Sequence, residues 1–229
     1  RIYQCDWSSD VCSSDLPSEL GTLGVEADAL ALHVAWDIGA AAVTRGLAKR
    51  LGLPAVLTTA SRLVIDCNRA PGHPGSIPAV SHGIVVPGNR NLAPAQRQAR
   101  EDAYFHPYHA AIAAELAAIE QRRGEGAVLI SIHSFTPGLA DMARPWHVGV
   151  LYNQDDRAAR IAIPLLEAEG LIVGDQQPYS GKLLNATMNR HAEADGRPYV
   201  GIEVRQDLIG HAEGQAEWAE RLARIRSEE

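Results

Sequence analysis

An imidazole stands directly after one of the most apolar stretches of the chain. His133 follows AVLISI, and the hydroxyls of Ser134 and Thr136 come just after it. A histidine is more often a structural hydrogen-bonding residue than a ligand. At the end of an apolar strand, however, its ring faces a crevice, with hydroxyls at hand to hold the second ring nitrogen. His133 is therefore a candidate metal ligand.

A second pair of polar residues lies in HVAWD, where His33 and Asp37 are four residues apart. If this segment is helical, the two side chains share one face of the helix. That face either meets solvent or meets a partner. A hydrolytic zinc ion takes three protein ligands and a water. His133 with Asp37 or His33 would supply two of the three.

Glu203 and Arg205 are two residues apart in IEVRQD and lie on one side of a strand. A charged side chain that points into a crevice is costly unless it is paired or functional. Glu203 suits a general base acting on a metal-bound water. The alternative is a surface ion pair on an edge strand.

Basic and amide side chains predict a carboxylate substrate. SRLVIDCNR holds Arg62, Asn68 and Arg69, and a guanidinium binds a carboxylate through two parallel hydrogen bonds. His109, in PYH, could hydrogen-bond the substrate or steady a ligand. Tyr179, in QPYSG, lies in a segment that could close over the site. Each of these signals is weak by itself.

The elements that must position these residues alternate along the chain. Helical spacing predicts helices over residues 26–51, 94–122 (bent near Pro107), 155–169, 182–194 and 215–226. Apolar and β-branched runs predict strands at 56–59, 64–65, 127–133, 146–152, 171–175 and 197–207. Four prolines and four glycines make residues 70–92 a long loop, of the kind that is usually functional. Such alternation implies an open, largely parallel sheet with chemistry at the carboxyl ends of its strands.

The first sixteen residues do not resemble the rest. DWSSDVCSSDL, residues 6–16, has no helical or strand periodicity and reads as the translation of a sequencing adapter. We interpret residues 1–16 as an artefact, the alternative being a disordered tail rich in serine and aspartate. Residues 17–229 are then predicted to form a single domain that lacks its native N-terminal strand.

Composition bounds the class of protein. The 229 residues carry 21 Lys and Arg against 28 Asp and Glu, a net charge of −7. Removing Arg1 and the three aspartates of residues 1–16 leaves 20 against 25, or −5. Such acidity argues against a nucleic-acid surface. Cys67 is then the only cysteine, which predicts a reducing compartment, the cytoplasm. No apolar run approaches the roughly 18 residues that a membrane span needs.

Taken together, seven motifs resemble one family. They are HVAWDIGA, SRLVIDCNR, VPGN, FHPYH, SIHSFTPG, RPWHVGVLY and IEVRQDL, in the order found in the N-formylglutamate amidohydrolase family, over residues 20–222. The resemblance implies an α/β fold, a three-layer αβα sandwich with a mostly parallel mixed sheet, as in zinc-dependent exopeptidases. It also implies hydrolysis of N-formyl-L-glutamate to formate and glutamate, as in histidine catabolism.

The resemblance assigns roles residue by residue. His133 and Asp37 become ligands of a divalent metal, zinc, with cobalt as the alternative. Glu203 becomes the catalytic base, with His109 as a second catalytic residue. The positions expected to bind a small carboxylate substrate are Arg62, Asn68, Arg69, Arg205 and Tyr179. The oligomeric state stays open.

Two departures from the family pattern bear on activity. Members usually carry a Glu-His or Pro-His motif on their first strand, and residues 1–16 hold no histidine. One metal ligand is therefore expected to be missing, and activity is expected of the natural parent more than of this chain. A loop expected to read Asn-Glu-Pro-Tyr reads Gln176, Gln177, Pro178, Tyr179. The alternatives are a deacylase for another N-acyl amino acid and a non-catalytic ligand-binding domain, in which His133, Asp37 and Glu203 would lie too far apart to share one ion.

Overall fold

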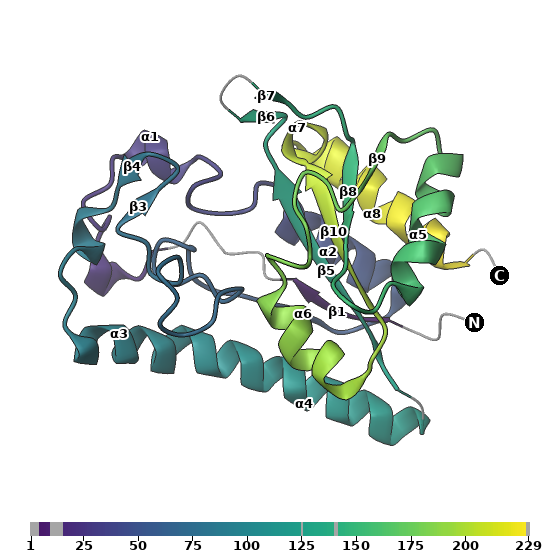
Figure 1. Ribbon diagram of the computed structural model, residues 1–229, viewed down its shortest axis with the longest axis horizontal. Helices are drawn as coiled ribbons and strands as arrows, with labels where there is room; N and C mark the ends of the chain where they lie inside the picture. The colour runs from purple at the N-terminus through teal and green to yellow at the C-terminus, as the bar shows by residue number, and fades with distance from the viewer. Residues whose placement is uncertain (1–4, 10–15, 125, 140–141, 228–229) are drawn as a thin grey trace.

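Six strands form the central sheet of the computed structural model, which describes residues 5–9, 16–124, 126–139 and 142–227 (Figure 1). Their order across the sheet is β2-β1-β5-β10-β8-β9. The strands are β1 (Cys5–Ser9), β2 (Ala55–Leu57), β5 (Val128–Phe135), β8 (Val148–Leu151), β9 (Val173–Asp175) and β10 (Tyr199–Arg205). β2, β1, β5 and β10 run parallel, β8 is antiparallel to β10, and β9 is parallel to β8. The sheet is therefore mixed and mostly parallel, as predicted.

Helices cover both faces of this sheet and make the fold a three-layer α/β sandwich (Figure 1). One face packs against α2 (Ala40–Leu51), α5 (Arg157–Ala168) and α8 (Ala212–Ser227). The other packs against α4 (His106–Arg123) and α6 (Ala186–His191). Side chains of a strand point alternately to opposite faces. Even-numbered positions of β5 and β10, such as Ile132 and Ile202, accordingly join the first core, and Leu129 and Tyr199 join the second.

The strand β1 was not expected. Residues 1–16 were predicted to take no part in the fold, yet Cys5–Ser9 lies between β2 and β5 and pairs with both in parallel. Backbone N–H and C=O groups make these ladders, so pairing places few demands on the side chains. Whether these residues are native stays a prediction. In either case, β1 fills an interior position of the sheet, between β2 and β5.

The predicted long helix over residues 26–51 is wrong in its middle. A single turn, α1 (Ala27–Leu30), is separated from α2 by turns, so His33 and Asp37 do not share a helix face. Gly39 ends this irregular segment with a φ of 81°, in the left-handed region. A Cβ there would lie 2.0 Å from the Ile209 carbonyl oxygen. Tertiary contact therefore overrides the helical propensity of an Ala- and Leu-rich stretch.

The predicted helix over residues 94–122 forms, with a local irregularity. α3 (Pro94–Arg100) continues through a π-helical turn, η3 (Glu101–Phe105), into α4. Pro107 follows that turn, and the wider π geometry accommodates a residue without an N–H donor. The strand predicted at residues 64–65 does not form, because this buried stretch turns instead.

Smaller elements complete the chain. The predicted loop over residues 70–92 contains a hairpin of β3 (Val80–Ser81) and β4 (Ile84–Val85). The others are β6 (Gly138–Leu139), β7 (Met142–Ala143), α7 (Gln206–Ile209), and the 3₁₀ turns η1 (Ser18–Leu20), η2 (Pro87–Asn89) and η4 (Glu193–Asp195). Within the described ranges, no helix is long and apolar enough to cross a membrane.

Candidate active site

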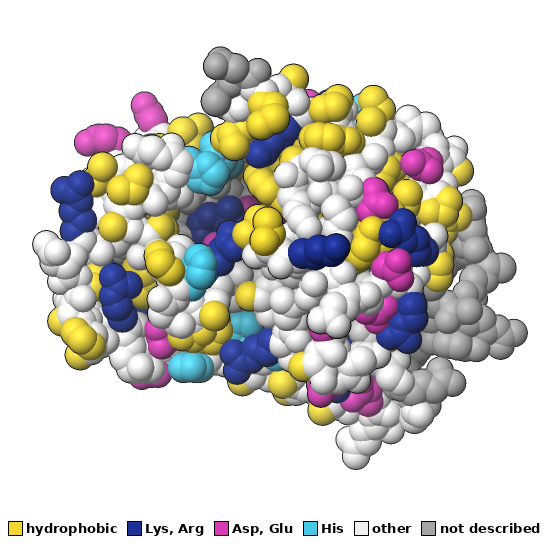
Figure 2. All heavy atoms as spheres, viewed as in Figure 1, with side chains coloured by type: hydrophobic (Ala, Val, Ile, Leu, Met, Phe, Trp, Pro, Cys, Tyr) yellow, Lys and Arg dark blue, Asp and Glu magenta, His cyan; other side chains and the backbone are white. Residues whose placement is uncertain are grey.

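A cavity of about 290 Å³ opens beside β5 and β10. His133 and Glu203 are direct neighbours in the parallel ladder, so their side chains emerge from the same face. Ser131 and Gly201, two residues earlier on each strand, also line the cavity. Figure 2 shows a hollow on this side of the molecule, around which basic and histidine side chains gather. The alternation of the two strands thus delivers an imidazole and a carboxyl group to one wall.

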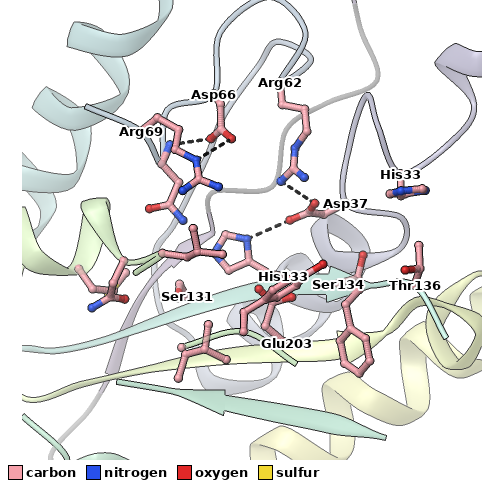
Figure 3. A pocket seen from close by; sticks show the side chains of 18 of the residues that line it. His33, Asp37, Arg62, Asp66, Arg69, Ser131, His133, Ser134, Thr136 and Glu203 are labelled. Carbon is pink, nitrogen blue, oxygen red and sulfur yellow. Dashed lines mark hydrogen bonds and ion pairs between the residues drawn. The ribbon is translucent and has the colours of Figure 1, made fainter. Parts of the chain in front are cut away.

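Asp37 joins two other residues into a buried chain of contacts (Figure 3). Its Oδ2 lies 2.9 Å from Nδ1 of His133, and its Oδ1 lies 2.7 Å from Nη2 of Arg62. Burial alone would raise the pKa of Asp37, but the Arg62 charge and the contact with His133 outweigh it, so the pKa is lowered. Asp37 is therefore a carboxylate that fixes the ring of His133.

Glu203 is the acid of the site that is left without a partner. The residue is only 8% exposed, and Oε2 is buried with no hydrogen-bond partner among the described residues. Burial raises its pKa to about 7, the Asp37 charge adds to the rise, and His133, Arg62 and Arg144 oppose it. A carboxyl group with such a pKa can both accept and release a proton near neutral pH.

Comparison with known proteins agrees with this geometry. The family model of N-formylglutamate amidohydrolase matches residues 3–210. The chain belongs to this family. A solved gene product of Agrobacterium tumefaciens is 36% identical, with a TM-score of 0.90 over 96% of this chain and 87% of that chain. The N-formylglutamate amidohydrolase of Ralstonia eutropha is 21% identical, with a TM-score of 0.75 over 96% of this chain and 90% of that chain. No curated protein matches the chain significantly.

Membership in the N-formylglutamate amidohydrolase family makes the chain a hydrolase of amide C–N bonds acting on an N-formylglutamate-like substrate. A non-catalytic domain would have kept His133, Asp37 and Glu203 apart. The structure instead brings all three to the wall of one cavity.

Four of the five residues predicted to bind substrate line the amidohydrolase cavity. They are Arg62, Asn68, Arg69 and Tyr179. Arg69 is paired with Asp66, with 3.7 Å between Nε and Oδ2. The Oδ1 atom of Asn68 accepts a hydrogen bond from the backbone N–H of Thr187, which ties this residue to the first turn of α6.

Arg205 and His109 lie elsewhere. Arg205 does not line the cavity but pairs with Asp207, at 2.8 Å. Because β10 ends at Arg205, the side chain meets the first turn of α7. His109 lies behind the cavity wall, with Nε2 3.1 Å from the Cys67 carbonyl oxygen and Nδ1 2.8 Å from Nε2 of His191. These contacts connect α4 with α6 and with Cys67, the residue that precedes Asn68. His109 therefore occupies a supporting position in the enzyme.

Sequence reasoning missed Arg144 and His82, and assigned His33 only as an alternative ligand. Nη1 of Arg144 donates to the hydroxyls of Tyr179 and Thr136, each at 3.1 Å, and the guanidinium covers the Tyr179 ring. Arg144 belongs to the family motif RPWHVGVLY, which was a signal that could have been used. His82 lies in an irregular loop, where no periodicity points to it.

The described residues supply part of the ligand set that the predicted metal would need. Both oxygens of Asp37 contact protein groups, Nδ1 of His133 and Nη2 of Arg62. Its role as a metal ligand stays a prediction. His133 has its Nδ1 held by a carboxylate, the arrangement common for metal-binding histidines. Among the described residues, no group of three or more His, Cys, Asp or Glu side chains could hold a metal ion.

Proposed function

We propose that the chain is built to hydrolyse N-formyl-L-glutamate to formate and L-glutamate, with Glu203 as the base. The observation that carries this proposal is the pairing of Glu203 with His133 at one register position. One side chain has a buried oxygen without a partner, and the other is held by Asp37.

The reaction needs a proton to move twice. Glu203 takes a proton from water as the water oxygen attacks the formyl carbon. When the C–N bond breaks, Glu203 returns the proton to the nitrogen, and the products are formate and a free amine. A pKa of about 7 suits both steps, because the group is partly ionised at neutral pH. Arg62 lies close enough for its charge to act on Glu203 and can stabilise the developing negative charge.

A divalent metal, zinc or cobalt, belongs to this proposal. Such an ion lowers the pKa of a bound water from about 15.7 towards 7. His133 would hold it, with Asp37 fixing the ring from behind. A further histidine ligand is expected on the first strand, as in other members of the family. β1 runs parallel to β5, so its carboxyl end points to the same edge of the sheet as His133.

The cavity also supports a small anionic substrate. Its volume of about 290 Å³ lies at the lower end of the range for small-molecule sites. Arg62 and Arg69 are each paired with an aspartate, so they offer hydrogen-bond donors without a large excess of positive charge. A dicarboxylate would therefore gain from the added charge of a metal ion.

A second candidate is removal of a longer acyl group from an amino acid. Four apolar side chains line the cavity beside the polar wall, namely Phe135, Leu151, Leu184 and Met188. They could contact an aliphatic acyl chain, whereas formyl needs no such surface. A role in histidine breakdown and a place in the cytoplasm follow the family resemblance and are part of the proposal.

The test is an assay of L-glutamate release with and without added Zn²⁺ or Co²⁺. N-formyl-, N-acetyl- and N-butyryl-L-glutamate are compared on wild-type protein and on His133→Ala. Metal-dependent turnover of the formyl compound is expected in wild type and should be lost in His133→Ala. Preference for the butyryl compound would select the second candidate. Turnover that is undiminished after a chelator has removed all bound metal would refute the metal mechanism.

A further inference from the structure

Two histidines outside the proposed mechanism meet at one end of the cavity. His33 lies in the turns between α1 and α2, and His82 lies at the tip of the β3–β4 hairpin. Both line the cavity. Their ring centroids are 4.8 Å apart, with the planes at 72°. Forty-nine residues separate them in sequence, so tertiary structure alone brings the two rings together.

The backbone at His82 is unusual for a residue with a side chain. His82 has a φ of 47° and Gly83 a φ of 82°, two consecutive left-handed residues, as a type I′ turn requires. Asn, Asp and Gly are the residues usually found at this first position, and other side chains cost of order 1 kcal/mol there. A histidine in this place is accounted for if its ring is needed at the cavity.

His33 contributes a buried polar atom that is not satisfied. Its Nε2 is shielded from solvent and has no hydrogen-bond partner among the described residues. Such an atom costs free energy unless a ligand or water completes it. The side chain of a bound substrate would do so.

The charges around the two rings favour an anion over a cation. Burial is the largest cause of a lowered pKa for both His33 and His82, and the Arg62 and Arg144 charges lower the pKa of each further. Asp37 is the one acid among the causes for His33, and it acts in the opposite direction. Two guanidinium groups beside the pair would repel a second metal ion and attract a carboxylate.

The pair of His33 and His82 lies away from the ion pair of Arg69 and Asp66. In Figure 3, His33 lies on the opposite side of Asp37 and His133 from Arg69 and Asp66. The centre formed by His133 and Glu203 thus has basic groups on two sides. A substrate with two carboxylates can be held from both.

We infer that His33 and His82, with Arg62 beside them, form a carboxylate subsite that receives one of the two carboxylates of the substrate. This inference rests on the proposed function for the identity of the substrate. The subsite itself is defined by the chemistry of the two rings and does not depend on turnover.

The experiment measures binding without catalysis. Calorimetry compares the affinity of glutarate, which has two carboxylates, with that of butyrate, which has one. The variants are His33→Ala, His82→Gly and the double variant, since glycine keeps the left-handed turn without strain. His106→Ala, an exposed histidine of α4, is the matched control. Thermal unfolding confirms that each variant is folded, and His82→Asn replaces His82→Gly if the hairpin is disturbed.

Wild type and His106→Ala are expected to bind glutarate more tightly than butyrate. Each subsite variant should lose about tenfold or more of the glutarate affinity, as expected for a hydrogen bond to a charged group. Butyrate binding should change less. Unchanged glutarate affinity in the double variant would overturn the inference. Loss of glutarate binding in a chain that never hydrolyses N-formylglutamate would leave the subsite standing and remove the proposed function instead.

Discussion

At the scale of single residues, burial and neighbouring charges set the pKa values of the two acids in the site. Arg62 and His133 lower the pKa of Asp37, whereas burial raises the pKa of Glu203, whose Oε2 has no hydrogen-bond partner among the described residues. Two acids in one cavity therefore differ in pKa through their surroundings alone. That difference supports the proposed roles, in which Asp37 orients His133 and Glu203 moves a proton.

Replacing Glu203 by glutamine should remove the base without changing its shape. The expected result is a fall in kcat of about 10²- to 10⁴-fold, with KM less affected. Steady-state assays on N-formyl-L-glutamate measure it. Glu217→Gln, on the exposed side of α8, is the matched control and should keep full activity. Wild-type kcat in Glu203→Gln would show that another group takes the proton.

The raised pKa of Glu203 also links stability to pH. Between the usual value of 4.5 and about 7, the folded protein holds a proton that the unfolded chain has released. Stability contributed by this group is therefore complete below pH 4.5 and is lost as pH rises to 7. At 1.36 kcal/mol per pH unit the loss is about 3 kcal/mol. Urea unfolding of metal-free protein at pH 5 and pH 8 should show wild type losing this much more than Glu203→Gln.

The residue types of the candidate site could be predicted from the sequence, but the contacts between their side chains could not. His133 and Glu203 follow regular apolar strands, so period-two alternation was enough to aim both at one crevice. Asp37 was found for its acidity, yet its role depends on Arg62, which a different loop supplies. His82 was not predicted, because no local sequence pattern indicates that the tip of a hairpin will line a cavity.

At the scale of elements, the break between α1 and α2 creates the site. An unbroken helix would have placed His33 and Asp37 on a regular surface. The turns instead carry both residues into the cavity, and the backbone N–H of Arg62 donates to the Ala35 carbonyl oxygen. Strands β5 and β10 were predicted because their pattern is local. This break was not, because the contact between Gly39 and Ile209 is invisible to propensity.

Gly39→Ala should therefore damage both the fold and the site. The new Cβ would overlap the Ile209 carbonyl oxygen, and the φ of 81° is strained for alanine. A loss of more than about 3 kcal/mol in unfolding free energy is expected. Gly52→Ala, at the end of α2, has a φ of 64° but open space around it, and should cost only about 1 kcal/mol. Equal losses in chemical denaturation would contradict the proposed contact.

At the scale of the whole molecule, β1 joins two parts of the sheet. β2 pairs with β1, and β1 pairs with β5, so the interior strand carries the connection of β2 to the remaining strands. The overall α/β class was predictable because helices and strands alternate. The identity of this strand was not, because ladder hydrogen bonds leave little trace in sequence.

Proline at position 7 tests that connection. Trp7 pairs with Ala55 on one side and Ile130 on the other. Trp7→Pro removes a backbone donor from an interior strand and should lower the unfolding free energy by about 3 kcal/mol or more. Trp7→Ala keeps the backbone N–H and serves as the control. Equal unfolding midpoints for the two variants would show that the ladder at this position contributes nothing.

The alternation of β5 and β10 has a consequence for how this enzyme tolerates change. Even-numbered positions from Val128 to Ile132 and from Val200 to Val204 lie in the core beside α2, α5 and α8, whereas Ser131, His133, Gly201 and Glu203 line the cavity. Saturation mutagenesis scored separately for abundance and turnover should separate the core positions of these strands from the cavity positions. Replacements at the even-numbered positions should lower the abundance of the protein, whereas replacements at Ser131, His133 and Glu203 should leave it abundant but inactive.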